Sequence, residues 1–222
     1  MLQGFGRGID HGQGRAVNRE RIRQILATAT TDPDPAVQLA GVRGLLRLGE
    51  PRGQEAWLEY VTRTDGDLDA FERDARLFEA LAAVVDFPFP EAQATLAGFL
   101  REPDALPDGL LMSIGAALGK IRHPQTFDLL IELLAHSSGF VAGAAATALG
   151  ELGDRLAVPH LIALADERHG DWFYPSTQAI LALGRLGGHQ ACMFLTHAVQ
   201  GSEIRESALE ALAMLAQANP ES

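Results

Sequence analysis

Apolar and small residues recur along the chain in six blocks with the period of an α-helix. Within each block they occupy an anchor position and the positions three, four and seven residues before it. The anchors are Leu48, Val85, Ile121, Leu152, Leu186 and Leu215. Offsets of −7, −4, −3 and 0 share one face of a helix with 3.6 residues per turn. The pattern predicts that each block opens with a helix that buries this face, and the frequent Gly or Ala at −4 favours close approach of a neighbouring helix.

A second apolar stripe follows the first five anchors after a break that contains Gly, Asp or Pro. It falls at offsets +6, +9, +10 and +13, as in Phe127, Leu130, Ile131 and Leu134 of the third block and Cys192, Leu195, Thr196 and Val199 of the fifth. In the second block the stripe comes two residues later, after the turn at residues 87–90. The spacing predicts a second helix in each of these blocks, and it places Cys192 in the core.

Helix starts and the size of each block indicate the fold class. Asp34 stands before Pro35 as an N-cap, and Ser138 and Ser202 stand at the matching place in later blocks. No segment alternates with period two. Two helices of about 12 residues cannot bury an apolar face alone, so neighbouring blocks must stack and share a core. We predict an all-α chain, an α-solenoid of about six helical hairpin repeats that forms an α-α superhelix.

The turns carry a resemblance to a known family. The segments Val37 to Gly49, Ala145 to Asp154 and Ala179 to Gly187 look like short HEAT-like repeats of the bilin-lyase type, and the resemblance covers roughly residues 33–218. It implies an architecture. It does not imply one activity, because such repeats occur in binding scaffolds, chromophore lyase subunits, a hydroxylase and DNA glycosylases. The second and third blocks depart from the pattern, with Asp86 and Arg122 where the others have Gly.

The ends of the chain differ from the repeats. Residues 1–18 contain five glycines and match no block, so we expect a flexible arm that carries Gly and Arg. Residues 19–30 are expected to form an opening helix that caps the first repeat with Ile22, Ile25 and Leu26. The predicted organisation is an arm over residues 1–18 and one HEAT-like domain over residues 19–222.

Composition and charge narrow the function. The chain has 222 residues, a net charge of −11 and one cysteine, Cys192, which fits a reducing compartment; we expect a cytoplasmic protein without a secretion signal or membrane span. A single lysine, Lys120, among many arginines suggests a bacterial source with a high GC content. After residue 30 the chain holds 13 basic against 27 acidic residues, which disfavours nucleic acid as the main ligand.

The sequence predicts no catalytic, cofactor or metal site. None of the seven histidines is followed by glutamate, whereas a hydroxylase of this repeat type would carry His-Glu pairs that bind iron. The set His189, Met193 and His197 shares one helix flank but spans about 12 Å, too far for one ion. We interpret it as a polar edge beside the core.

Two groups of residues are predicted to bind a partner. Acidic side chains at offsets +7 and +11 of the second helices would line the concave side, together with a histidine at +11 of the fifth block. The predicted residues are Glu55, Glu59, Asp128, Glu132 and His197. The second group is the aromatic run Trp172, Phe173 and Tyr174 in an inter-repeat loop; folding back over the repeat junction is the alternative role for that loop.

The leading hypothesis is a non-catalytic scaffold or adaptor that binds a protein, with a basic partner as one option. A lyase or isomerase subunit that acts on a bilin-like or other conjugated cofactor is the alternative, and it rests only on the repeat type. A DNA-lesion glycosylase is the third candidate, and it would need a basic groove. The sequence leaves the oligomeric state open.

Overall fold

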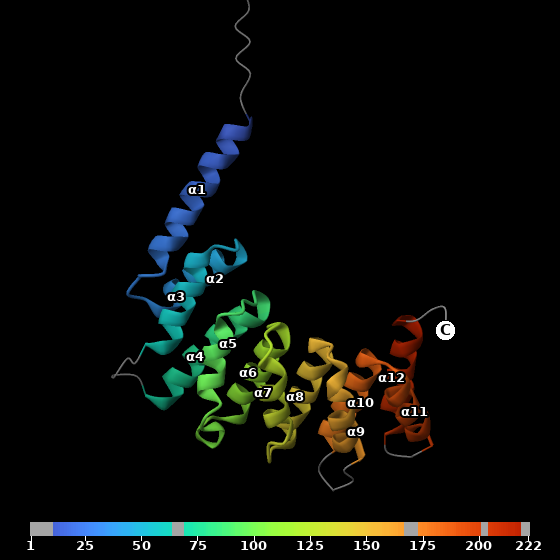
Figure 1. Cartoon of the computed structure of the whole chain (residues 1–222). Helices are drawn as coiled ribbons and strands as arrows, with labels where there is room; N and C mark the ends of the chain where they lie inside the picture. Colours follow the sequence, from blue (N-terminus) through green and yellow to red (C-terminus); the bar gives the residue numbers. More distant parts are fainter. Residues whose placement is uncertain (1–10, 64–68, 167–172, 201–203, 219–222) are drawn as a thin grey trace, which may run out of the picture. The chain divides into compact units, whose positions relative to one another are not determined.

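The protein is built from helices, and the predicted all-α solenoid is confirmed. The computed structural model describes residues 11–63, 69–166, 173–200 and 204–218, and these residues contain no strand. The α-helices are α1 (His11–Ala29), α2 (Pro35–Arg47), α3 (Pro51–Thr62), α4 (Ala70–Asp86), α5 (Ala92–Phe99), α6 (Asp108–Lys120), α7 (Thr126–Leu134), α8 (Gly139–Leu152), α9 (Val158–Asp166), α10 (Phe173–Leu186), α11 (His189–Ala198) and α12 (Arg205–Ala218) (Figure 1). Two short 3₁₀ helices, η1 (Pro103–Ala105) and η2 (Arg155–Ala157), lie between them.

The chain divides into two compact units, Met1–Thr64 and Asp65–Ser222, where the sequence suggested one domain over residues 19–222. The opening helix also differs from the prediction, because α1 begins at His11. Residues 11–18, expected in the flexible arm, are therefore helical. The rest of that arm, residues 1–10, lies outside the described residues.

In unit 1, α2 packs against both α1 and α3. Asp34 caps α2 as predicted, since its Oδ1 accepts a hydrogen bond of 2.9 Å from the N–H of Ala36. The contact between α1 and α2 depends on a glycine: a Cβ atom at Gly44 would lie 2.5 Å from Cδ2 of Leu26. Of the three residues expected to cap the first repeat, Leu26 makes this contact, whereas Ile22 and Ile25 are 43% and 61% exposed.

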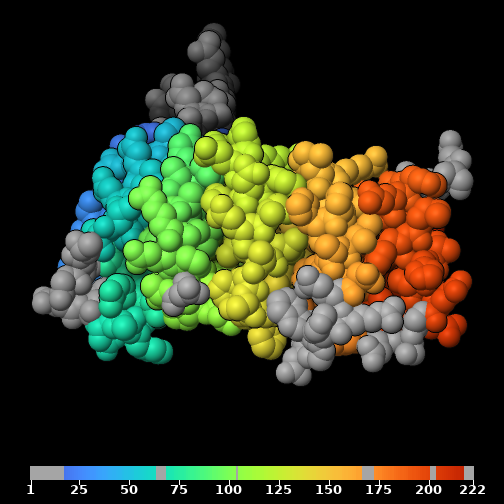
Figure 2. All heavy atoms as spheres, turned by 60° about the horizontal axis from the view of Figure 1, so that its bottom comes forward, coloured from blue at the N-terminus to red at the C-terminus, as the bar shows by residue number. Residues whose placement is uncertain are grey.

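Unit 2 consists of helical hairpins stacked side by side. The first helices of successive repeats pack in the order α4, α6, α8, α10 and α12. The second helices α7, α9 and α11 pack against these first helices, and α9 also contacts α11. Figure 2 shows successive repeats of this unit as consecutive colour bands along the molecule, from green to red. Each hairpin thus shares its core with its neighbours, as a solenoid requires.

The predicted buried face of the first helices is confirmed in full in two of the six repeats and in part in the others. Offsets −7, −4, −3 and 0 are buried in the third and fifth repeats, at Ile114, Ala117, Leu118 and Ile121 and at Ala179, Ala182, Leu183 and Leu186. Two positions are exposed, the first anchor Leu48 at 47% and Phe78, at −7 of the second repeat, at 49%. Six more are half-buried, namely Gly44, Ala82, Val85, Leu152, Leu212 and Leu215.

The buried face of the second helices is rotated from the predicted one. The positions buried in every aligned second helix are +5, +9 and +12, namely Gly53, Trp57 and Tyr60, then Thr126, Leu130 and Leu133, then Ala157, Leu161 and Leu164, then Ala191, Leu195 and Ala198. The placement of Cys192 in the core is therefore wrong. This residue, at +6 on α11, is exposed, and the neighbouring Ala191 fills the core position instead.

The turns explain why the second and third repeats depart from the sequence pattern. Gly153 ends α8 with φ of +80°, a left-handed conformation that favours glycine because it has no Cβ. Gly49 and Gly187 hold the same place and also have positive φ. Where Arg122 stands instead, the preceding residue Ile121 ends α6 in an extended conformation, so the chain leaves the helix by another route.

Candidate functional site

The predicted acidic residues lie on exposed helix faces in both units. On α3, Glu55 and Glu59 are one turn apart and exposed, on the opposite side from the buried Trp57. On α7, Asp128 and Glu132 are likewise exposed and one turn apart. None of these four carboxylates forms an ion pair with another described residue, so each is available to a partner.

These carboxylates do not form one continuous row in unit 2. The equivalent positions of α9 are occupied by Pro159 and Ala163, and those of α11 by Met193 and His197, which are exposed. The second helices nevertheless adjoin one another, because the ring of Phe127 on α7 meets the ring of His160 on α9 edge to face, with centroids 6.4 Å apart. Along this face of unit 2, the acidic character is concentrated on α7.

The described part of the predicted aromatic run is helical. Trp172 lies outside the described residues. Phe173 and Tyr174 form the first turn of α10 rather than a loop, and they are 58% and 38% exposed. The ring of Tyr174 contacts that of Phe140 at the start of α8, with centroids 5.6 Å apart and an angle of 43° between the planes. Phe140 is itself 62% exposed. We call Phe140, Phe173 and Tyr174 the aromatic cluster.

Sequence reasoning missed Phe140, although the repeat alignment contained the signal. Phe140 stands 12 residues before the anchor Leu152, and Tyr174 stands 12 residues before the anchor Leu186. Equivalent positions of adjacent repeats lie side by side in a solenoid, so the two rings were bound to be neighbours. Tyr174 also has a structural role, because it covers Gly143, where a Cβ atom would lie 2.5 Å from its ring.

Polar contacts hold the chain in place just before Phe140 of the aromatic cluster. Ser138, two residues before Phe140, donates a hydrogen bond of 2.6 Å from Oγ to Oδ2 of Asp108 at the start of α6. Its backbone N–H donates to Nδ1 of His136 at 3.1 Å. Ser138 is thus the N-cap residue of α8 by position, as predicted, but its side chain bridges to the preceding repeat and makes no capping hydrogen bond. The other predicted cap, Ser202, lies outside the described residues.

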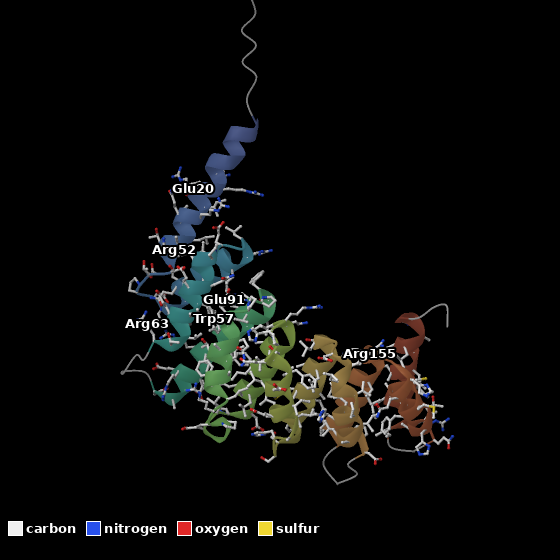
Figure 3. The ribbon with its side chains drawn as sticks, viewed as in Figure 1. Glu20, Arg52, Trp57, Arg63, Glu91 and Arg155 are labelled. Carbon is white, nitrogen blue, oxygen red and sulfur yellow. The ribbon has the colours of Figure 1, made fainter. Side chains whose placement is uncertain are left out.

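A further contact between repeats is made by Arg155 in the turn before α9 (Figure 3). Its Nε donates a hydrogen bond of 3.2 Å to the carbonyl oxygen of Leu186 in the next repeat. The carboxylate of Asp154 caps the same turn by accepting a 2.9 Å bond from the N–H of Leu156. The Arg155 contact links the fourth and fifth repeats at the end opposite to the N-termini of α8 and α10.

The histidine-rich edge of α11 remains an exposed polar edge. His189, Met193 and His197 are all exposed and follow one another along the helix. Among the described residues there is no group of three or more His, Cys, Asp or Glu side chains placed to hold a metal ion. No helix in the described part of the chain is both long and apolar enough to cross a bilayer.

Comparison with known proteins agrees with this architecture. Residues 110–173 match the family model for HEAT repeats, which confirms the predicted repeat type in the segment from α6 to the start of α10. The crystal structure of an engineered protein is similar with a TM-score of 0.51 and 18% identity, over 89% of this chain and 97% of that chain.

The structure of human deoxyhypusine hydroxylase in complex with glycerol is similar with a TM-score of 0.44 and 16% identity, over 92% of this chain and 91% of that chain. No curated protein matches the sequence. The matched HEAT repeats and the engineered protein of similar fold agree with a helical repeat architecture.

Proposed function

We propose that this HEAT-repeat chain is a non-catalytic scaffold that binds a protein partner in the cytoplasm. The observation that carries the proposal is the aromatic cluster, in which rings from two consecutive repeats meet on the surface. Exposed apolar rings of this size are a common mark of protein interaction sites. Aromatic side chains also supply much of the binding energy at such sites, because they bury a large area with few rotatable bonds.

The charge of the chain favours a basic partner. Residues 65–222 hold nine basic against 22 acidic residues, whereas residues 1–64 hold nine basic against seven acidic residues. Asp108 accepts a hydrogen bond from Ser138, which stands two residues before Phe140 of the aromatic cluster. A partner segment with Lys or Arg next to an apolar side chain would complement both features. Asp128 and Glu132 on α7, and Glu55 and Glu59 on α3, would add further attraction for such a partner.

The test separates binding from folding. Phe140 and Phe173 project from the surface, whereas Tyr174 packs on Gly143 and is left intact. We would capture partners from a lysate of the source organism, purify the one that is retained, and measure its affinity by calorimetry for the wild type and for the double variant Phe140→Ala/Phe173→Ala. Loss of two aromatic contacts at a binding site should weaken the affinity by tenfold or more, equal to about 1.4 kcal/mol.

Phe71→Ala is the matched control, because Phe71 on α4 is an equally large ring that is 81% exposed outside the cluster. It should leave the affinity unchanged. An unchanged affinity of the double variant would exclude the aromatic cluster as the binding site. Turnover of a retained small molecule by the purified chain would contradict the non-catalytic role.

A further inference from the structure

The exposed side of α12 has the features of the surface that stacks repeats elsewhere in unit 2. In α6, α8 and α10 the position two residues before the anchor is Gly119, Gly150 or Gly184, and each lies against the next first helix. The same position of α12 is Ala213, which is exposed. Leu209, one turn earlier, is 49% exposed, whereas its equivalents Gly115, Ala146 and Ile180 are all buried. Within the described residues, this face therefore has no helix on it.

Acidic side chains border this face. Glu206 and Glu210 are exposed on α12, at spacings that place them on the same side as Leu209 and Ala213. Neither forms an ion pair with another described residue. A helix that covered Leu209 would bring its own side chains next to these two carboxylates, so basic residues on that helix would be favoured.

A helix of that chemistry exists in the chain itself. On α1, Ile22 and Ile25 are largely exposed. Ile25 also lines a shallow hollow of about 470 Å³, together with Arg21, Gln24, Thr28, Ala29, Asp32 and Val37. Arg21, one turn before Ile25 on the same side of α1, is exposed and forms no ion pair with another described residue. The face therefore combines apolar and basic side chains.

We propose that α1 of one copy of this protein docks on α12 of a second copy. Ile25 would meet Leu209, while Arg21 would lie close to Glu206 and Glu210, so apolar burial and charge both favour the contact. Each copy carries one of each surface, and the contact uses different surfaces on the two copies. Such a contact leads to a closed ring or to an open chain of copies. This self-association is independent of the aromatic cluster.

Two variants and their mixture test the contact. Ile25→Glu places an acid on the α1 face, and Leu209→Arg places a base on the α12 face; both residues are exposed, so thermal unfolding should be unchanged. Sedimentation velocity should show that the wild type grows in mass with concentration and that each variant alone is a monomer. An equimolar mixture should give a heterodimer, because the Leu209→Arg copy keeps its α1 and the Ile25→Glu copy keeps its α12. Added salt should weaken both assemblies.

Every other pattern of masses overturns the proposal. A wild type that stays monomeric at its highest soluble concentration would exclude self-association. Assembly of Ile25→Glu alone would show that α12 meets α12, and assembly of Leu209→Arg alone would show that α1 meets α1. The control is Leu156→Glu, a similar change at a leucine on η2 that is 68% exposed, and it should assemble like the wild type.

Discussion

The backbone of Gly150 on α8 lies directly against Ala182 on α10, since a Cβ atom at Gly150 would be 3.0 Å from both Cα and Cβ of Ala182. The same relationship recurs between Gly119 and Ala148 and between Gly184 and Ala211. In each pair the glycine stands two residues before one anchor and the alanine stands four residues before the next. The close spacing of these first helices therefore depends on the absence of a side chain at one repeated position.

Replacing Gly150 with Ala should destabilise the protein, although alanine is the better helix former. Alanine would gain up to about 1 kcal/mol in helix propensity. The added methyl group would force α8 and α10 apart, and overpacking of a core typically costs about 1–3 kcal/mol. We expect a net loss of up to about 2 kcal/mol, measured as a lower urea midpoint by far-UV circular dichroism.

Gly98→Ala provides the control for that experiment. Gly98 lies within α5, and nothing lies within 4 Å of a Cβ atom added there. Only the helix propensity changes, so Gly98→Ala should be neutral or stabilising by up to about 1 kcal/mol. If Gly150→Ala also raised the midpoint, the close approach of α8 and α10 would not be needed for stability.

The sequence predicted the first helices well and the second helices less well, for a physical reason. Offsets −7, −4, −3 and 0 were recognisable because large aliphatic residues such as Ile114 and Leu118 recur at helical spacing among small residues. The second helices carry small residues at the core position +5, such as Ala191, and apolar residues that are partly exposed at +10, such as Ile131. Because apolar residues lie on both sides of the core positions, the sequence does not fix which face of the helix is buried. The uncertainty is about one residue, or 100° of rotation about the helix axis.

For the candidate site too, the sequence predicted some features and missed others. The exposure of Glu55 and Asp128 followed from their place opposite the core positions. The pairing of Phe140 with Tyr174 could be predicted only by comparing equivalent positions of adjacent repeats, because the two residues lie 34 positions apart in the chain. The division of the chain after Thr64 was not predicted, because the spacing from Leu48 to Val85 is similar to that from Val85 to Ile121.

Gly153 should be sensitive to substitution for a reason that involves the backbone alone. It adopts φ of +80°, and no atom lies within 4 Å of a Cβ atom added there. Alanine in a left-handed conformation costs roughly 1–2 kcal/mol, whereas asparagine tolerates it better. We expect Gly153→Ala to lower the free energy of unfolding by about 1 kcal/mol or more and Gly153→Asn by less. Equal losses for both variants would indicate that the turn rearranges.

Cys192 should react as a surface thiol. It is exposed on α11, beside the buried Ala191. The folded protein should therefore be labelled by Ellman's reagent at the same extent with and without denaturant. Cys192→Ser should change the free energy of unfolding by no more than about 0.5 kcal/mol, as expected of a surface site. If labelling required denaturant, the thiol of Cys192 would be buried in the folded protein, in contradiction to the structure.

The acidic pairs of α3 and α7 can be tested separately because they lie in different units. Glu55→Lys/Glu59→Lys and Asp128→Lys/Glu132→Lys each reverse two exposed charges, so helical content should be retained. The second variant also removes an acid from the first turn of α7, which costs about 0.3–1 kcal/mol of helix stability.

With a basic partner, each double variant should weaken binding mainly through a slower association rate, and the fourfold variant should abolish it at moderate salt. Glu91→Lys/Glu102→Lys is the matched control, with the same change in net charge at exposed positions around α5. Surface plasmon resonance at two salt concentrations distinguishes attraction by the net charge of the protein from attraction by these particular carboxylates. Equal losses for the control and the two test pairs would mean that net charge alone attracts the partner, and unchanged binding in the fourfold variant would remove these carboxylates from the interface.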